Sequence, residues 1–196
     1  MRTLAVSAWA PELDGAELPP DVERREIGVG LVEAAAGAER ALAELEPDLI
    51  VLVGTCGSLP QSDLRVGQVV IAKTATLVLR EGEYAPAPMA RIADADAELS
   101  ARLAERLAAP LVTCASPLGI TSDDREAARL AYEGAQIEQL ECFALLRAAA
   151  RRDVPAIALF AVANRVGKDA QAEWRANRFE AENAAKRALA IALAKK

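Results

Sequence analysis

The chain has 196 residues, of which 53% are hydrophobic, 27% charged and only 4% aromatic. This composition is typical of a globular, alanine-rich protein with a substantial core and excludes a disordered chain. The net charge of −6 argues against nucleic acid or an anionic membrane as the main partner. No apolar run approaches the roughly 18 residues that a membrane-spanning helix requires.

Two residue types narrow the chemistry further. Histidine is absent, which excludes Ser-His-Asp and Cys-His machinery, HExxH zinc sites and a His general base. Acid–base chemistry must therefore come from carboxylates, Lys, Tyr, Cys or water. The three cysteines, Cys56, Cys114 and Cys142, are widely spaced and odd in number. They indicate free thiols in a reducing cytoplasm.

Apolar runs bounded by Pro, Gly and charged residues alternate with segments of helical period along the chain. The opening MRTLAVSAWA superficially resembles a secretion signal, but its apolar part is short, so we interpret it as a first strand. In the first half of the chain we expect a strand at 2–7, an irregular connection at 11–25, a helix at 31–45 and strands at 49–53, 66–72 and 76–79. The last two of these strands are either separate or one bent ribbon. In the second half we expect a helix at 94–107, a strand at 111–115, helices at 124–132 and 136–152, a strand at 156–162 and a helix at 170–194.

This alternation predicts an α/β fold of three layers. We find no internal repeat, low-complexity tract or interdomain linker, so we expect one domain spanning residues 1–196. In open α/β sheets, ligands bind beyond the carboxyl ends of the strands. That rule selects three places, residues 8–12, 54–58 and 163–167.

The segment GTCGS at 54–58 ends an apolar run in small residues. It lacks the Lys-Ser/Thr of a phosphate-binding P-loop. Two interpretations stay open: its glycines let a ligand approach the backbone, or they clear neighbouring packing. The segment IGVGLVEAA is not a dinucleotide fingerprint, because Glu33 stands where the third glycine belongs and no acidic residue ends a second strand.

Glu141 is the most informative single residue. On the expected helix 136–152 it shares an apolar face with Ile137, Ala144 and Ala148. A buried glutamate is costly unless it is paired or hydrogen-bonded. Glu141 therefore either pairs with an Arg or Lys or faces a polar ligand.

Two further polar residues follow apolar strands. Asn164 ends the run AIALFAVAN and is either a turn-former or a ligand group. Glu12 follows Trp9-Ala10-Pro11 and is either a solvated loop acid or part of a site.

Seven short motifs, taken in their order along the chain, resemble those of the purine nucleoside phosphorylase/nucleosidase superfamily, particularly its nucleosidase branch. They are AWAPE ending at Glu12, GVGLVEAA, GTCG, VGQVV, ITSDD, Leu140-Glu141 and Ala163-Asn164. The ending ANRVGKDAQAEW is similar to that of futalosine hydrolases, which remove hypoxanthine from a menaquinone precursor. The resemblance implies a nucleoside phosphorylase-like αβα sandwich with a central mixed sheet, acting as an N-glycosyl hydrolase on a purine nucleoside.

The resemblance also implies roles for individual residues. Glu12 would activate water, Glu141 would hold the ribose hydroxyls and Asn164 would take the base. The other implied substrate-binding residues are Thr55, Cys56, Gly57, Leu140 and Ala163. An amide cannot act as a general acid, and its donor and acceptor edge complements a 6-oxopurine such as hypoxanthine.

Several departures keep alternatives open. Phosphorylases carry basic residues around the phosphate, whereas Phe160 stands four residues before Asn164 and the early loop has no Arg or Lys, so hydrolysis is favoured over phosphorolysis. A methylthioadenosine/adenosylhomocysteine-type nucleosidase is a further alternative. Ala163 and Leu140 replace the family's Ser and Met, which also allows a catalytically inactive nucleoside-binding homologue.

The resemblance implies a small-molecule purine nucleoside as the partner, no metal or organic cofactor, and no nucleic acid or membrane. Nucleosidases of the family are commonly homodimers with their sites near the interface, so we expect a cytoplasmic homodimer.

Overall fold

A computed structural model describes residues 2–79 and 88–194 of the chain. The strands are β1 (Thr3–Ser7), β2 (Val22–Glu26), β3 (Leu49–Ser58), β4 (Val69–Leu77), β5 (Ile92–Asp94), β6 (Leu111–Ser116), β7 (Ile137–Glu138) and β8 (Ala156–Arg165). The helices are the short 3₁₀ helix η1 (Ala10–Glu12) and α1 (Leu31–Leu45), α2 (Ala97–Leu107), α3 (Asp124–Tyr132), α4 (Cys142–Arg151) and α5 (Ala170–Leu193).

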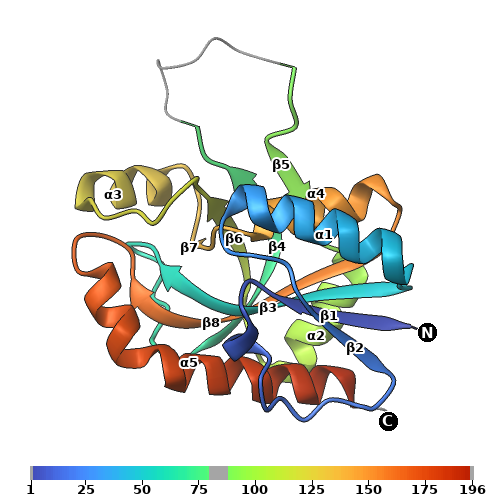
Figure 1. Ribbon diagram of the computed structural model, residues 1–196. Coiled ribbons are helices and arrows are strands. Elements are labelled where there is room, and N and C mark those ends of the chain that lie inside the picture. Colours follow the sequence, from blue (N-terminus) through green and yellow to red (C-terminus); the bar gives the residue numbers. More distant parts are fainter. Residues whose placement is uncertain (1, 80–87, 195–196) are drawn as a thin grey trace.

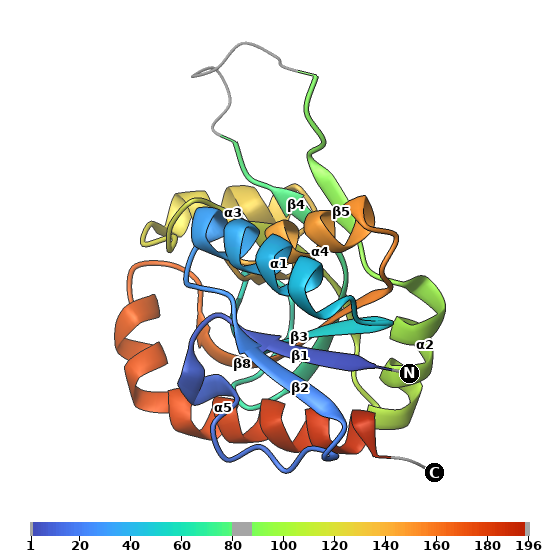
Figure 2. The same ribbon diagram turned by 45° about the vertical axis from the view of Figure 1, so that its right-hand side comes forward.

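The strands form one mixed sheet with helices on both faces, which confirms the predicted three-layer α/β architecture. Helices α1 and α4 cover one face, and α2 and α5 cover the other (Figures 1 and 2). The sheet also closes on itself, because β8 pairs with β3 in parallel and with β4 antiparallel. Strands β3, β7, β6, β4 and β8 therefore form a ring, which the sequence pattern did not indicate.

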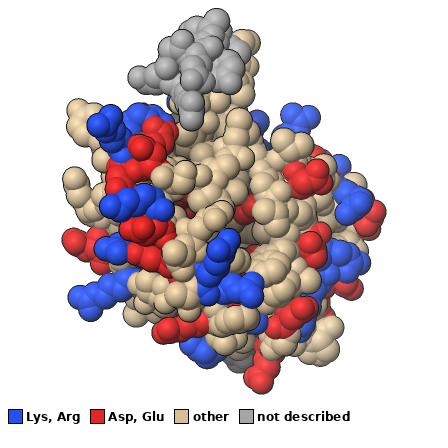
Figure 3. Space-filling view, turned by 60° about the vertical axis from the view of Figure 1, so that its left-hand side comes forward, with Lys and Arg blue, Asp and Glu red and all other residues tan. Residues whose placement is uncertain are grey.

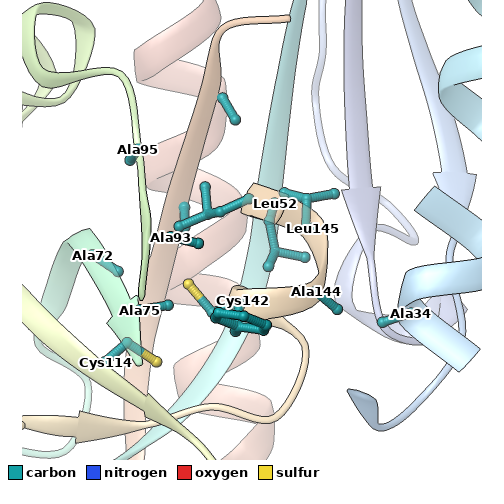
Figure 4. Close-up of a cluster of buried hydrophobic side chains, with 14 of the residues drawn as sticks. Ala34, Leu52, Ala72, Ala75, Ala93, Ala95, Cys114, Cys142, Ala144 and Leu145 are labelled. Carbon is teal, nitrogen blue, oxygen red and sulfur yellow. The ribbon is translucent and has the colours of Figure 1, made fainter. Parts of the chain in front are cut away.

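The central strands bury both faces, as their continuous apolar runs predict. Along β3, even-numbered residues such as Leu52 pack beneath α1 and α4, and odd-numbered residues such as Val53 pack against α5. Figure 4 shows Leu145 of α4 beside Leu52, with the thiols of Cys114 and Cys142 among the neighbouring alanines. All three cysteines are free and buried.

Two short strands, β2 and β5, lie where the sequence predicted a connection and the start of a helix. β2 lies in the expected connection 11–25 and pairs in parallel with β1 at the sheet edge. Its sequence VERRE is mostly exposed, so it lacks the apolar signal of a strand. β5 occupies the expected start of the helix 94–107, which begins only at Ala97 because the Asp96 carboxylate caps the Leu99 amide.

The prediction of one helix over 136–152 is wrong for residues 136–141. Residues 137–138 form β7, and α4 begins at Cys142. The Gln139 side-chain carbonyl accepts hydrogen bonds from the backbone N–H groups of Glu141 and Cys142, at 3.0 and 2.7 Å, and so starts the helix there. Glu141 consequently precedes the helix rather than lying on its apolar face.

The two expected strands 66–72 and 76–79 are one strand, β4, with an irregularity in its pairing with β6 between Ala72 and Thr74. Within residues 2–79 and 88–194, every helix falls short of the length and apolar character needed to cross a membrane. The single domain over residues 1–196 stays a prediction.

Candidate active site

A cavity of about 370 Å³ opens at the carboxyl ends of β1, β3 and β8. The turn between β7 and α4 and the start of α5 complete its wall. This volume lies in the usual range for a small-molecule site. Figure 3 looks onto this side of the molecule, where mostly uncharged surface surrounds a hollow near the centre and basic side chains lie beside it.

Glu12 lies in this cavity, buried at 4% exposure, because η1 turns its side chain toward β3. Its Oε1 accepts a hydrogen bond from the Thr55 backbone N–H at 2.9 Å, while Oε2 is buried without a hydrogen-bond partner among the described residues. Gly54 makes this possible, since a Cβ there would stand 2.6 Å from Oε1. On the outer side, the Lys186 ammonium of α5 donates to the carbonyls of Pro11 and Asp14 and ties down η1.

Burial raises the pKa of Glu12 from 4.5 to about 8, with smaller contributions in the same direction from the charges of Glu141 and Glu182. The hydrogen bond from Thr55 opposes the shift without cancelling it. Near neutral pH this carboxyl group can therefore both hold and release a proton, as a general acid or base must.

Glu141 faces the same cavity and is also 4% exposed. The Gly30 backbone N–H donates to its Oε1 at 2.6 Å, and the Gln139 amide donates to its Oε2. Among the described residues, no Arg or Lys side chain pairs with Glu141 or Glu12. Of the two interpretations of Glu141, the structure thus favours the one in which it faces a polar ligand.

Asn164 lies at the other end of the cavity, beside Gly57. Its Nδ2 donates to the carbonyl of Arg165 at 2.8 Å, which leaves one N–H and the carbonyl oxygen of the amide for other partners. A Cβ on Gly57 would stand 3.0 Å from Nδ2 and 2.7 Å from a methyl group of Val166.

The two glycines of GTCGS therefore clear space for Glu12 and Asn164, which are side chains of the protein itself. This is the packing interpretation of the segment, and GTCGS continues β3 instead of following it. Thr55, Cys56 and Leu140 also line the cavity, as the resemblance implied. Ala163 does not join them: it faces the opposite side of the sheet and packs in the core covered by α5.

Several cavity residues were missed by the sequence reasoning. Trp9 and Trp174 form one wall, with ring centroids 6.2 Å apart, and the Arg178 guanidinium stacks over both rings at 5.5 and 5.3 Å. The Trp174 indole N–H donates to the Thr55 hydroxyl at 3.3 Å. The scarcity of aromatic residues was a usable signal, because both tryptophans of the chain lie here.

Glu138 is a third buried carboxylate of the cavity, and nothing in its local sequence distinguished it. Arg175 corrects the expectation of a site without cations, because it lines the cavity edge from α5, although its side chain is exposed. Within the described ranges, Cys, Asp and Glu side chains form no group that could hold a metal ion.

Sequence comparison matches residues 25–195 to the model of the phosphorylase superfamily. No curated protein matches the chain by sequence.

Solved structures of similar fold include three nucleosidases. The S-adenosylhomocysteine nucleosidase of Streptococcus pyogenes, in complex with 5-methylthiotubericidin, has a TM-score of 0.86 at 18% identity, covering 98% of this chain and 96% of that one. The 5'-methylthioadenosine/S-adenosylhomocysteine nucleosidase of Neisseria meningitidis, in complex with methylthio-immucillin-A, has a TM-score of 0.84 at 16% identity, covering 98% and 99%. The futalosine hydrolase of Helicobacter pylori has a TM-score of 0.85 at 13% identity, covering 97% and 96%.

The raised pKa of Glu12 predicts a pH-dependent stability. The folded protein keeps the Glu12 proton up to about pH 8, whereas the unfolded chain releases it near 4.5. Between these values the free energy of unfolding therefore falls as pH rises, by up to about 1.4 kcal/mol per pH unit from this group. We expect Glu12→Gln to remove this contribution, so that its stability declines less steeply than that of the wild type between pH 5 and 8, as measured by urea unfolding.

The exposed Glu17→Gln is the control for loss of one acidic side chain. Parallel stability curves for wild type and Glu12→Gln would contradict the assigned pKa.

Proposed function

Because the chain belongs to the phosphorylase superfamily, we propose that it is a nucleosidase that hydrolyses the N-glycosidic bond of a purine nucleoside. The ribose lies between Glu12 and Glu141, and the base lies toward Asn164. The partner is thus a small-molecule nucleoside, and the three buried free thiols fit a reducing cytoplasm.

The observation that carries this proposal is the pair of buried carboxylates, Glu12 and Glu141, on one cavity without a cationic partner in the described parts of the chain. A buried carboxylate needs hydrogen-bond donors. Ribose hydroxyl groups supply such donors, and their bonds to a carboxylate are strong when water is excluded.

The same geometry supports a mechanism. A water oxygen attacks C1′ of the ribose while the bond from C1′ to the base nitrogen breaks and the base departs with the electron pair. Glu12 accepts the proton of the attacking water, a role that suits a carboxyl group with a pKa of about 8. The charge of Glu141 stabilises the positive charge that develops on the sugar.

Asn164 supports a 6-oxopurine as the leaving base. Its free N–H can donate to the carbonyl oxygen or the imidazole nitrogen of such a ring, and its carbonyl oxygen can accept from a ring N–H, but an amide cannot protonate the base. The absence of a general acid at this position costs about 10²–10⁴-fold in rate. Hypoxanthine tolerates that loss better than adenine, because it is the better leaving group.

Water is favoured over phosphate as the nucleophile. Phe160, where phosphorylases carry a basic residue, is fully buried in the core beneath α4. Arg175 lines the cavity, but its side chain is exposed to solvent. A futalosine-like nucleoside, which would connect the enzyme to menaquinone biosynthesis, is therefore our preferred substrate, and the fold shared with a futalosine hydrolase is compatible with it.

We also propose that the protein is a homodimer with the cavity near its interface. Val29 and Ile120, which line the cavity, are 60% and 54% exposed, and the nearby Val32 and Leu118 are 71% exposed. Apolar groups of this kind beside a site fit cover by a second subunit. Sedimentation equilibrium is expected to give twice the monomer mass of 20.7 kDa. The Val32→Glu variant is expected to have a lower measured mass, because the new charge weakens the association of the two subunits. A monomer at all concentrations would contradict the proposal.

The proposed activity predicts release of hypoxanthine from futalosine or inosine without any need for phosphate. We expect Glu12→Gln to lower kcat by at least about 10²-fold, since it removes the base. Base release is measured by chromatography for futalosine, inosine, methylthioadenosine and adenosylhomocysteine, with and without phosphate. Because Glu12 must be ionised to accept a proton, kcat/KM of the wild type is expected to rise with pH up to about 8.

Each other outcome has a distinct meaning. A requirement for phosphate would make the protein a phosphorylase. Purine binding with no release from any substrate would make it a binding homologue, and release of adenine alone would retain the class but refute the argument from Asn164.

Asn164→Asp tests the base specificity directly. An acid at this position can protonate the departing purine, so we expect the ratio of kcat/KM for methylthioadenosine to that for inosine to rise by about tenfold or more. Asn177→Asp on α5, where the amide donates to the carbonyl of Ala163 outside the cavity, is the matched control. An unchanged ratio in Asn164→Asp would contradict the role of the amide.

A further inference from the structure

Trp174 of α5 lines the cavity, and its indole N–H points to the residue that holds Glu12. This N–H donates to the Thr55 hydroxyl oxygen at 3.3 Å. The same hydroxyl donates to Oε1 of Glu12 at 3.4 Å, and the Thr55 backbone N–H donates to that oxygen at 2.9 Å. A continuous chain of polar contacts therefore runs from α5, through β3, to the carboxyl group on η1.

The chemistry of the three groups fixes the direction of this chain. An indole N–H can only donate a hydrogen bond, so the Thr55 oxygen must accept it. The single hydroxyl proton is then left for Oε1 of Glu12, which accepts it together with the backbone N–H. Oε2 of Glu12 is buried and has no hydrogen-bond partner among the described residues. Oε1 is thus occupied by two donors, and Oε2 is the oxygen that can take a further proton.

Stacking keeps the Trp174 ring in the orientation that this chain requires. The Arg178 guanidinium, one turn further along α5, lies 5.3 Å from the centroid of the Trp174 ring and 5.5 Å from that of Trp9. A cation over an aromatic ring at this distance is attracted to it. Trp9 directly precedes η1, so the stack connects the Trp174 ring to the element that carries Glu12.

We propose that Trp174 is a positioning residue that acts on Glu12 through the Thr55 hydroxyl, so that Oε2 of Glu12 is the oxygen that accepts the proton of the attacking water. This inference rests on the proposed function as a nucleosidase. Without the indole N–H, the hydroxyl is free to rotate and to turn its proton away from Oε1. A proton can then settle on Oε1 as readily as on Oε2, and fewer of the orientations of the carboxyl group are productive.

Four charged side chains belong to the surroundings of Glu12. Burial is the main cause of its raised pKa, and the charges of Glu141, before α4, and Glu182, on α5, raise the pKa further. Burial also raises the pKa of Glu182, which Arg178 and Lys186, four residues to either side, act to lower. None of these groups belongs to the chain of contacts from the indole to the carboxyl group. A change confined to that chain therefore leaves all four charges in the protein.

Removal of the hydroxyl bond changes the pKa of Glu12 in one direction. A hydrogen bond to the ionised carboxylate favours that form and lowers the pKa. Loss of the bond from Thr55 therefore raises the pKa of Glu12 above about 8. The rise of kcat/KM with pH is expected to move to higher pH by at least about 0.4 unit. A role of Trp174 in packing alone would not produce this shift.

The test is a double-mutant cycle, with kcat and kcat/KM measured as a function of pH on inosine or futalosine. Trp174→Phe keeps an aromatic ring but removes the N–H, and Thr55→Val replaces the hydroxyl by a methyl group. Each change is expected to lower kcat about tenfold and to shift the pH profile. Because Trp174 acts through the hydroxyl, Trp174→Phe is expected to have no further effect on kcat in the Thr55→Val protein.

Two variants serve as controls for this cycle. Thr55→Ser keeps the hydroxyl and is expected to retain kcat within about threefold of the wild type and an unshifted pH profile. Trp9→Phe makes the same chemical change on the neighbouring ring and is expected to have equal effects with and without the Thr55 hydroxyl. An effect of Trp174→Phe on kcat that is as large in Thr55→Val as in the wild type would overturn the inference.

A second measurement does not depend on turnover. The chain has two tryptophans, so the indole N–H groups give two signals in a proton–nitrogen NMR spectrum, which Trp9→Phe assigns. The Trp174 signal is expected to shift with the ionisation of Glu12, near pH 8, and to lose this response in Glu12→Gln and Thr55→Val.

The two measurements separate failure of this inference from failure of the proposed function. A Trp174 signal that shifts equally in Thr55→Val and in the wild type would overturn the route through the hydroxyl, even where base release supported the nucleosidase. Failure of the wild-type protein to release a base from any of the substrates would instead overturn the proposed function, whatever the NMR titration shows.

Discussion

The site depends on one constraint, the burial of the Glu12 carboxyl group against the backbone of β3. That position requires a residue without a side chain at Gly54 and a free backbone donor at Thr55. It also requires η1 to be held in place, which Lys186 of α5 achieves through two backbone carbonyls. Loss of solvent is the largest cause of the raised pKa of Glu12, so the same packing that fixes its geometry also sets its proton affinity.

The closure of the sheet explains why residues from distant parts of the sequence meet at this point. β8 pairs with both β3 and β4. β7 pairs with the last two residues of β3, Gly57 and Ser58. The carboxyl end of β3 therefore lies between β8 and β7. Glu12 after β1, Glu138 on β7 and Asn164 on β8 all line the same cavity. A flat open sheet in sequence order would not bring Glu138 and Asn164 to the same row.

The predictable part of this protein was the part with a strong local signal. Long apolar runs identified β3 and β8, and helical periodicity identified α1, α3 and α5 with nearly their observed bounds. β2 and β7 escaped because one is an exposed edge strand and the other has two residues. The resemblance pointed to Glu12, Glu141 and Asn164, but it could not show that Gln139 ends the strand and starts α4, because that depends on a side-chain hydrogen bond.

Burial of acidic groups that have no cationic partner among the described residues lowers the stability of the folded protein. Oε2 of Glu12 and Oε2 of Glu138 are both buried without partners in the described structure, and burial raises the pKa of each side chain. Such groups are retained where a ligand supplies the missing donors, because each bond formed then relieves a penalty already present. Under the proposed function, the sugar hydroxyls are the donors that Glu12 lacks.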